Sequence, residues 1–353
     1  MAGMNSPNPE RGVAIAGEQG FIARNLAQHC LERTDVVLET DVSEASANGR
    51  VIFYIFDDVP LSSTSTACSL NLEEKQQAIA RLQAASDCDL VVLAKPDSIS
   101  VLEKSIPTDA GNMVFVSLVE VFGKWAATGA ANLVADACLK VSRHEEAEIT
   151  FPEIRQFIYV DDLCRSLLSG ITSAAYVPVI PGPVYEMSAD KLAKALCSIR
   201  ESRITQVVPH VGNGLLRALY ATYISYLDQK DFSYPLDNHA DARGSFIEFL
   251  KMETHGQISC LTAKPGVTRG QHYHHSKCER FLVLQGTAKF AFRNLLNDEA
   301  HEITVSAETP EVVESIPGWV HNIKNIGTEE LIVVLWANEV FNPALPDTNQ
   351  AEM

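Results

Sequence analysis

The first half of the chain alternates short apolar runs with longer segments in which apolar residues recur at helical spacing. The apolar runs cover residues 12–17, 50–56 and 89–95, and the helical patterns cover residues 21–33 and 72–86. Strands that are covered by helices on both faces read as continuous apolar runs. This half is therefore predicted to be an α/β domain with a Rossmann-like, doubly wound parallel sheet.

The pattern changes near Asp237. Beyond this position, glycine, proline and asparagine turns separate short strand-like runs over residues 245–251, 256–263, 280–286, 287–294, 311–316 and 331–338. Such a series without helices is typical of an all-β domain and fits a single closed barrel. Residues 215–235 have the pattern of a helix that runs into a proline-ended linker. We expect two domains, residues 1–236, which include this interdomain helix, and residues 237–353.

The composition excludes several function classes. The 353 residues carry a formal net charge of −17, which disfavours a nucleic-acid partner because phosphate contacts need a basic surface. Eight cysteines occur without a Cys-x2-Cys pair, so we expect free thiols in a reducing compartment. No basic segment followed by a long apolar run opens the chain, and no stretch of about 18 apolar residues follows. The protein is expected to be cytoplasmic, without a membrane partner.

One segment of the second domain carries the residues of a metal site. His272 and His274 are two positions apart, so on a strand their side chains point to the same face. Glu279 follows five residues after His274, a gap that allows the next strand to return a carboxylate to the imidazoles. His321, in the separate segment 317–325, is the fourth candidate ligand. The two blocks match the paired signatures of the cupin barrel, a double-stranded β-helix or jelly roll.

The donor set indicates which metals suit this site. Three nitrogen ligands and one oxygen ligand suit zinc, and Fe(II), manganese or nickel would accept the same set. The alternative is a barrel that keeps these polar residues without metal, but burying them without a common partner would cost free energy. Asn325 is interpreted as a turn residue rather than a ligand. A metal-dependent oxygenase would share the ligand set, and oxygen consumption would reveal it.

Taken together, the two halves resemble the bifunctional capsular polysaccharide enzymes of the CapF or WbjC type. The matching residues are 122–125 (FGKW), 159–162 (YVDD), 231–235 (DFSYP), 241–246 (DARGSF), 264–275 (KPGVTRGQHYHH) and 321–325 (HNIKN). In that family, an extended short-chain dehydrogenase domain is fused to a zinc cupin. The resemblance implies that the cupin epimerises carbon 3 of a UDP-linked 4-keto-6-deoxy-N-acetyl sugar, and that the other domain reduces the ketone with NADPH. It also implies a homodimer.

The resemblance extends to residues that would surround the sugar. Arg243 stands in a block similar to the start of the deoxysugar 3,5-epimerases, where the arginine meets the nucleotide diphosphate. A guanidinium suits that role because it is a planar, bidentate donor. Arg269 and Lys264 are candidates for stabilising an enolate, or are charges at the barrel rim. His275 and Tyr273 are candidate proton carriers, although strand alternation turns both away from the face of the metal-binding histidines.

The first domain departs from the family pattern where its chemistry should lie. Gly17, Gly20 and Arg24 are candidates for binding a nucleotide phosphate at a helix start, and a structural turn is the alternative. Ala23 stands where a third glycine is expected. Reduction of a ketone needs a phenol as proton donor and a lysine that lowers its pKa, yet residues 95–122 contain no tyrosine. We predict a degenerate reductase fold, for which NADPH is a doubtful cofactor.

These observations favour a metal-dependent epimerase that acts on a nucleotide-linked 4-keto-6-deoxy sugar, in the synthesis of a cell-surface polysaccharide or glycosylated metabolite. One alternative is a bifunctional epimerase and NADPH-dependent reductase with an unrecognised proton donor. Oxidation of NADPH by a 4-keto sugar would identify it. Another alternative is a non-catalytic sugar-nucleotide binding or scaffold protein, which would bind the sugar without proton exchange.

Overall fold

The computed structural model describes residues 11–39, 51–58, 71–84, 88–106, 112–129, 132–145, 149–172 and 175–353. The chain divides into two compact units. The N-terminal unit comprises residues 1–197 and 211–229, and the C-terminal unit comprises residues 198–210 and 230–353. The division between the units falls within helix α6 (Ala189–Thr205). Because this helix is continuous, the sequence pattern does not indicate a boundary there. The predicted boundary at residue 237 stays a prediction.

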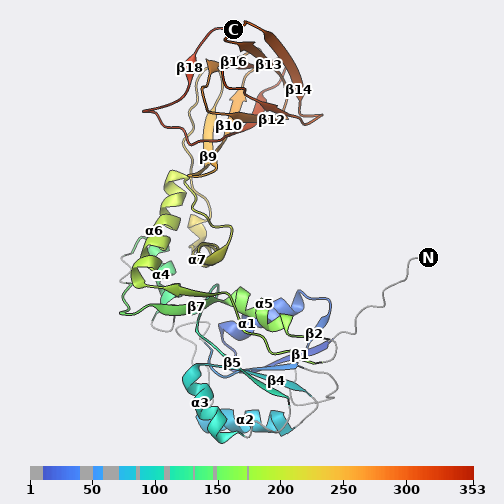
Figure 1. The fold of residues 1–353 in the computed structure, drawn as a ribbon, viewed down its shortest axis with the longest axis vertical. Coiled ribbons are helices and arrows are strands. Elements are labelled where there is room, and N and C mark those ends of the chain that lie inside the picture. Colours follow the sequence, from blue (N-terminus) through green and yellow to red (C-terminus); the bar gives the residue numbers. More distant parts are fainter. Residues whose placement is uncertain are drawn as a thin grey trace, which may run out of the picture. The chain divides into compact units, whose positions relative to one another are not determined.

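A five-stranded parallel sheet forms the centre of the N-terminal unit (Figure 1). Its order is β2-β1-β3-β4-β5, with the bounds β1 Arg11–Gly17, β2 Val36–Glu39, β3 Val51–Ile55, β4 Asp89–Ala94 and β5 Met113–Ser117. Every residue of β3 and β4 is buried, as expected for strands that are covered on both faces. Helices α2 (Leu72–Ala84) and α3 (Pro96–Ser105) cover one face, and α1 (Phe21–Leu31) lies on the other. The predicted Rossmann-like sheet is confirmed.

The rest of the N-terminal unit contains a small sheet and further helices. Its strands are β6 (Glu120–Phe122), β7 (Arg155–Tyr159) and β8 (Val184–Met187), in the order β6-β7-β8. The helices are α4 (Leu133–Ser142), α5 (Val160–Ser169), the first part of α6, and α7 (Gly214–Ser225). The helix expected over residues 215–235 thus ends at Ser225, and only a short 3-10 turn, Gln229–Asp231, follows. The polar run 228–231 offers no apolar face on which a longer helix could pack.

Two five-stranded antiparallel sheets make up the barrel of the C-terminal unit (Figure 1). Their orders are β15-β12-β17-β10-β9 and β14-β13-β16-β11-β18. The bounds are β9 Phe246–Met252, β10 Gly256–Ala263, β11 Thr268–Tyr273, β12 Glu279–Gln285, β13 Thr287–Asn294, β14 Ala300–Ser306, β15 Val312–Glu314, β16 Trp319–Asn325, β17 Leu331–Ala337 and β18 Asn349–Gln350. Phe281 and Leu335 of one sheet pack with Phe290 and Ile323 of the other. The predicted all-β, cupin-like domain is confirmed.

Two further findings bear on the sequence predictions. The cysteines within the described ranges are all free thiols, as expected. In the same ranges, no helix is both long enough and apolar enough to cross a membrane. The cellular location and the homodimer stay predictions.

Candidate metal centre and its cavity

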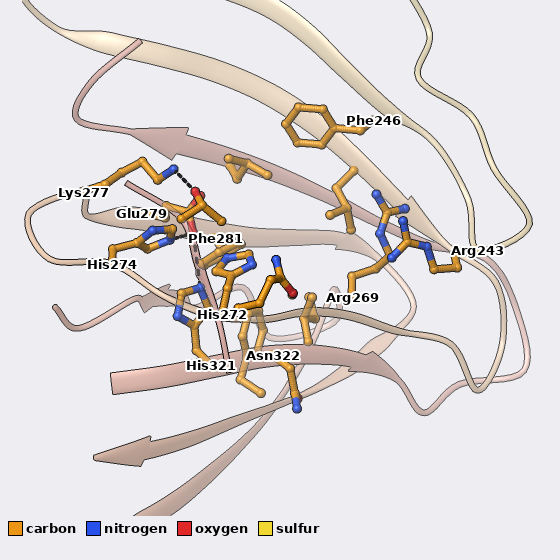
Figure 2. Close-up of a pocket in the computed structure, with 17 residues that line it drawn as sticks. Arg243, Phe246, Arg269, His272, His274, Lys277, Glu279, Phe281, His321 and Asn322 are labelled. Carbon is orange, nitrogen blue, oxygen red and sulfur yellow. Dashed lines mark hydrogen bonds and ion pairs between the residues drawn. The ribbon is translucent and has the colours of Figure 1, made fainter. Parts of the chain in front are cut away.

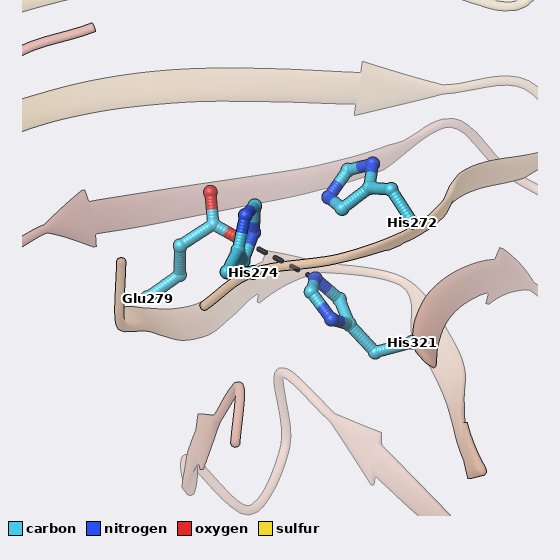
Figure 3. Close-up of side chains that lie close together, drawn as sticks. All are labelled: His272, His274, Glu279 and His321. Carbon is cyan, nitrogen blue, oxygen red and sulfur yellow. Dashed lines mark hydrogen bonds and ion pairs between the residues drawn. The ribbon is translucent and has the colours of Figure 1, made fainter. Parts of the chain in front are cut away.

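Three strands of the C-terminal unit bring the four candidate metal ligands together (Figure 3). His272 lies in β11, His274 directly follows that strand, Glu279 begins β12, and His321 lies in β16. His272 pairs with His321 across the β11–β16 ladder. The potential ligand atoms of the four residues all lie within 4.8 Å of one another. The structure thus assembles this cluster, while metal binding by it stays a prediction.

An irregularity in β11 sets the position of His272. The register between β11 and β16 shifts between Gly270 and His272. Gly270 and Gln271 both have a positive φ, at 90° and 69°. A Cβ atom on Gly270 would lie 3.0 Å from the carbonyl oxygen of His321. Glycine is therefore needed at this bulge, because only the lack of a side chain permits both the backbone angle and the close approach of the strand that carries His321.

The electrostatics of the cluster favour the protonation states that metal ligands require. Glu279 Oε2 lies 3.2 Å from His274 Nε2 and 3.3 Å from His321 Nε2. Burial by itself raises the pKa of Glu279, but the two imidazoles outweigh burial and hold that pKa well below its usual range. Burial, followed by the charge of His321, lowers the pKa of His272 to about 4. At neutral pH the carboxylate is charged and His272 is neutral, as metal coordination demands.

A segment near the C-terminus orients His274. The Nδ1 atom of His274 lies 2.5 Å from the carbonyl oxygen of Asp347. A carbonyl only accepts, so Nδ1 carries the proton and Nε2 is left with a lone pair for a metal. The Asp347 carboxylate accepts hydrogen bonds from the backbone N–H groups of His275, Ser276 and Lys277 at 2.8–2.9 Å. Asp347 therefore fixes the turn after β11, although no motif in the sequence marks it.

The residues present fit a bound metal ion. Both ring nitrogens of His321 are buried: Nε2 lies 3.3 Å from Glu279 Oε2, and Nδ1 has no hydrogen-bond partner among the described residues. A buried imidazole nitrogen without a partner costs free energy, unless a ligand or another group binds it. Three imidazoles and one carboxylate form a donor set that zinc and several other divalent metals accept. The cluster could therefore hold a divalent metal, and its donors do not select zinc alone.

The metal cluster lines a cavity of about 300 Å³ together with two arginines (Figure 2). Figure 2 shows Arg243 and Arg269 close together, on the side of the cavity away from the histidines. Burial and the positive charge of Arg243 lower the pKa of Arg269. Asp241 lies 2.6 Å from Arg243 Nη2 and balances part of this charge. The arginine pair is suited to an anionic group of a ligand whose other end lies at the metal cluster.

Lys277 also lines this cavity and is not among the site residues predicted from the sequence. The residue is 6% exposed, and its Nζ donates to the carbonyl oxygen of Pro346 at 3.1 Å and to Thr348 Oγ1 at 2.7 Å. Neither acceptor is charged, and no carboxylate of the described residues forms an ion pair with Lys277. Its place in the turn between His274 and Glu279 is the one sequence feature that could have indicated it.

Three other candidates do not line the cavity. Tyr273 is turned away from it by strand alternation, and its ring meets that of His275 edge to face, with centroids 5.4 Å apart. The Lys264 side chain is exposed, and its backbone N–H donates to the carbonyl oxygen of Arg243 at 3.0 Å. The structure thus brings Arg243 and Arg269 to the predicted metal site, but not Lys264, Tyr273 or His275.

Known proteins share both the architecture and the sequence of this chain. Two crystal structures of the capsular polysaccharide assembling protein CapF from Staphylococcus aureus are similar to it with TM-scores of 0.80 and 0.81 at 28% and 27% identity. Each match covers 97% of this chain and at least 99% of the CapF chain. The sequence is also 36% identical to the UDP-2-acetamido-2,6-beta-L-arabino-hexul-4-ose reductase of Pseudomonas aeruginosa, over 95% of this chain and 97% of that protein. The chain belongs to the CapF-type family.

Further matches agree with membership of the CapF-type family. Residues 239–349 match the family described as the polysaccharide biosynthesis C-terminal domain. A shorter match, 25% identical over 32% of this chain and 81% of the relative, is to the spore coat polysaccharide biosynthesis protein SpsL of Bacillus subtilis. The relatives of this CapF-type chain are sugar-nucleotide-modifying enzymes of polysaccharide synthesis, which supports the prediction that it is an enzyme.

The predicted phosphate-binding residues of this CapF-type chain lie near the start of α1. Gly17 has a φ of 85°, and a Cβ atom there would lie 2.3 Å from the carbonyl oxygen of Ile55. Contact between neighbouring strand ends thus explains this glycine without any nucleotide. Gly20 and Arg24 line a hollow of about 370 Å³ with Glu39, and the Arg24 guanidinium lies 5.9 Å from the ring centre of Trp125.

The larger cleft of the N-terminal unit, about 770 Å³, is lined by residues that follow β3, β4 and β5, and no tyrosine is among its described lining residues. Tyr159, at the end of β7, is buried away from that lining, and burial together with Asp161 raises its pKa. Lys124 is bound to Asp161, which also lies 2.8 Å from His29 Nε2. A buried phenol with a raised pKa, next to a carboxylate that already binds the lysine, is not arranged as a proton donor to a ketone.

Proposed function

We propose that the C-terminal unit is a metal-dependent epimerase that acts at carbon 3 of a nucleotide-linked 4-keto-6-deoxy sugar. The observation that carries this proposal is one cavity with a cluster of potential metal ligands and two arginines in its lining. The 4-keto end of the sugar would lie at the cluster, and the diphosphate would lie at Arg243 and Arg269. The names of the relatives support a role in polysaccharide synthesis, and a role in glycosylated-metabolite synthesis is the alternative.

The reaction removes an acidified C–H proton beside the ketone and returns a proton to the opposite face. His272, His274, Glu279 and His321 would hold the metal, for which zinc is our first choice. A divalent metal bound there supplies positive charge that stabilises negative charge on the ketone oxygen. The protein must supply the groups that carry protons and the shielding from water.

Among the residues of the cavity, we assign one proton transfer to Lys277. Its ammonium group is buried at the cavity wall and hydrogen-bonds only to neutral oxygens in the described structure. An unpaired ammonium close to the metal cluster can stabilise an enolate oxygen and donate a proton. Arg269 is the second positive group in the same lining and stays a candidate for enolate stabilisation.

The test is NMR of a UDP-linked 4-keto-6-deoxy-N-acetylhexose in deuterated water, with metal-loaded and metal-free protein. We expect deuterium to appear at carbon 3 with the metal-loaded protein and not with the metal-free protein. This exchange should not require NADPH. Metal analysis of the purified protein would identify the ion. The mass of the protein in solution would test the expected homodimer. Tight binding of the sugar nucleotide without exchange would contradict the epimerase and support a non-catalytic binding protein.

A second candidate function is a bifunctional epimerase and NADPH-dependent 4-ketoreductase. The observation that favours it is the 36% identity to a protein that is named as a reductase. Loss of NADPH absorbance in the presence of the 4-keto sugar would support this function. We expect no loss, because the cleft of the N-terminal unit lacks a tyrosine among its described lining residues.

A further inference from the structure

The N-terminal unit has the crevice in which open α/β sheets bind their ligands. The chain passes from β2, on one side of β1, to β3 on the other, so the topological switch point lies between β1 and β3. Ligands of such sheets bind at this point, outside the carboxyl ends of the strands. In dinucleotide-binding units, the pyrophosphate lies on the free backbone N–H groups at the start of the first helix. The equivalent helix here is α1, which begins at Phe21.

The carboxylate of Asp58 occupies these N–H groups. Asp58 Oδ1 accepts a hydrogen bond from the N–H of Ile22 at 2.9 Å, and Oδ2 accepts one from the N–H of Ala23 at 3.1 Å. Both donors belong to the first turn of α1, where N–H groups have no partner within the helix. The same donors and the helix dipole would otherwise attract a phosphate. The anion at the start of α1 is thus supplied by the chain itself.

Glu18 holds the backbone of Asp58 in place, and Glu18 and Asp57 add negative charge beside the start of α1. Glu18 Oε2 accepts a hydrogen bond from the N–H of Asp58 at 2.9 Å, and Glu18 Oε1 pairs with Lys75 Nζ at 2.6 Å. Asp57 Oδ2 accepts a hydrogen bond from the N–H of Lys95, at the start of α3, at 2.8 Å. Two consecutive aspartates thus satisfy donors at the starts of two helices that border the crevice.

We infer that the N-terminal unit does not bind a dinucleotide, because the Asp58 carboxylate stands where the pyrophosphate would lie. A bound dinucleotide would have to displace this carboxylate from two N–H groups and then lie beside Glu18 and Asp57. Lys75, one of the cations near this crevice, is already paired with Glu18. The residues present therefore do not fit NADPH. This inference concerns the N-terminal unit alone and holds whether or not the C-terminal unit is an epimerase.

Binding of NADPH and NADH to the full-length, metal-loaded protein tests the inference by calorimetry and by energy transfer from tryptophan to the nicotinamide. We expect no saturable signal up to about 1 mM dinucleotide, a concentration at which a weak site with a Kd of about 1 mM is half filled. Saturable binding by the wild-type protein with a micromolar Kd would overturn the inference. These readouts do not require activity of either unit.

Two variants test whether Asp58 is the cause. Asp58→Asn removes the charge and keeps an oxygen that can cap the helix, and Asp58→Gly removes the side chain altogether. Asp97→Asn is the matched control, because Asp97 lines the same cleft at the start of α3. We expect both Asp58 variants to bind NADPH at least about tenfold more tightly than the wild type, since like charges in one site oppose binding, and we expect no gain for the control.

Folding of the variants is checked by circular dichroism and by metal content. If Asp58→Gly does not fold, Asp58→Asn still answers the question because it keeps the cap. Folded Asp58 variants that bind NADPH no better than the wild type would overturn the causal role of Asp58. A gain in Asp97→Asn equal to that in Asp58→Asn would also overturn it, because general negative charge in the cleft would then be the cause.

Discussion

In the C-terminal unit, a buried ring nitrogen of a residue that lines the cavity is left without a partner among the described residues, whereas in the N-terminal unit the chain itself satisfies N–H donors at the start of α1. The Nδ1 atom of His321 is buried without a hydrogen-bond partner among the described residues. The N–H groups of Ile22 and Ala23, by contrast, are bound to Asp58. Unsatisfied buried groups cost free energy, so they mark places where a ligand stabilises the fold. If both proposals hold, the two units keep a ligand-binding architecture while only the C-terminal unit keeps the capacity to bind.

Removal of a metal ligand should have the largest effect and would abolish the function proposed for the C-terminal unit. We expect His321→Ala to lose bound metal and all detectable deuterium exchange at carbon 3. Removal of a direct ligand should have a larger effect than the loss of about 10- to 100-fold that follows removal of a residue supporting a ligand. Metal analysis and NMR measure the two effects. His275→Ala is the control, because His275 does not line the cavity. Exchange at the wild-type rate by metal-free His321→Ala would contradict the proposed site.

Replacement of Lys277 should have the next largest effect. We expect Lys277→Met to reduce the exchange rate about 100- to 10,000-fold, the range that positioned acid–base groups contribute. Metal content should not change, because Lys277 is not one of the clustered ligands. Lys264→Met is the matched control, since its side chain lies outside the cavity lining. An equal loss in both lysine variants, or no loss in Lys277→Met, would refute the assignment.

Asp347→Ala should weaken the metal site without abolishing it. The variant loses the carboxylate that holds the backbone N–H groups of the turn after His274. We expect metal affinity to fall about 10- to 100-fold, as for other supporting contacts of metal ligands. Competition with a chelator measures the affinity, and Asp298→Ala, at an exposed ion pair with Arg293, provides the control. An unchanged affinity would show that the turn holds its shape without Asp347.

Gly17→Ala should change stability and leave the metal site alone. A Cβ atom at this position would meet the carbonyl oxygen of Ile55, and the φ of 85° is unfavourable for alanine. We expect a loss of about 1–3 kcal/mol in the free energy of unfolding of the N-terminal unit, the usual cost of such backbone strain. Denaturant titration measures this loss, and metal content and exchange should stay at wild-type values. A variant as stable as the wild type would point back to a nucleotide role for Gly17.

Much of the fold follows from local patterns. The apolar runs at 50–56 and 89–95 correspond to β3 and β4, because a strand that is buried on both faces needs apolar residues at nearly every position. The spacing of His272, His274 and Glu279 indicated one cluster, because strand alternation and a tight return are local properties. The helix expected over residues 215–235 was predicted too long, since its later residues are polar and end the helix at Ser225.

The sequence by itself determined the fold class, the family and the cluster of four candidate ligands. The tertiary structure decided that Lys277 shares the cavity with this cluster while Tyr273 does not. It also decided which donors the chain satisfies internally: Asp58 reaches the N–H of Ile22 from 36 residues away, and the Asp347 carbonyl reaches His274 from 73 residues away. Periodicity and spacing describe neighbours along the chain, whereas these contacts depend on how distant segments pack together. Whether a polar group is left for a ligand is therefore a property of the folded chain.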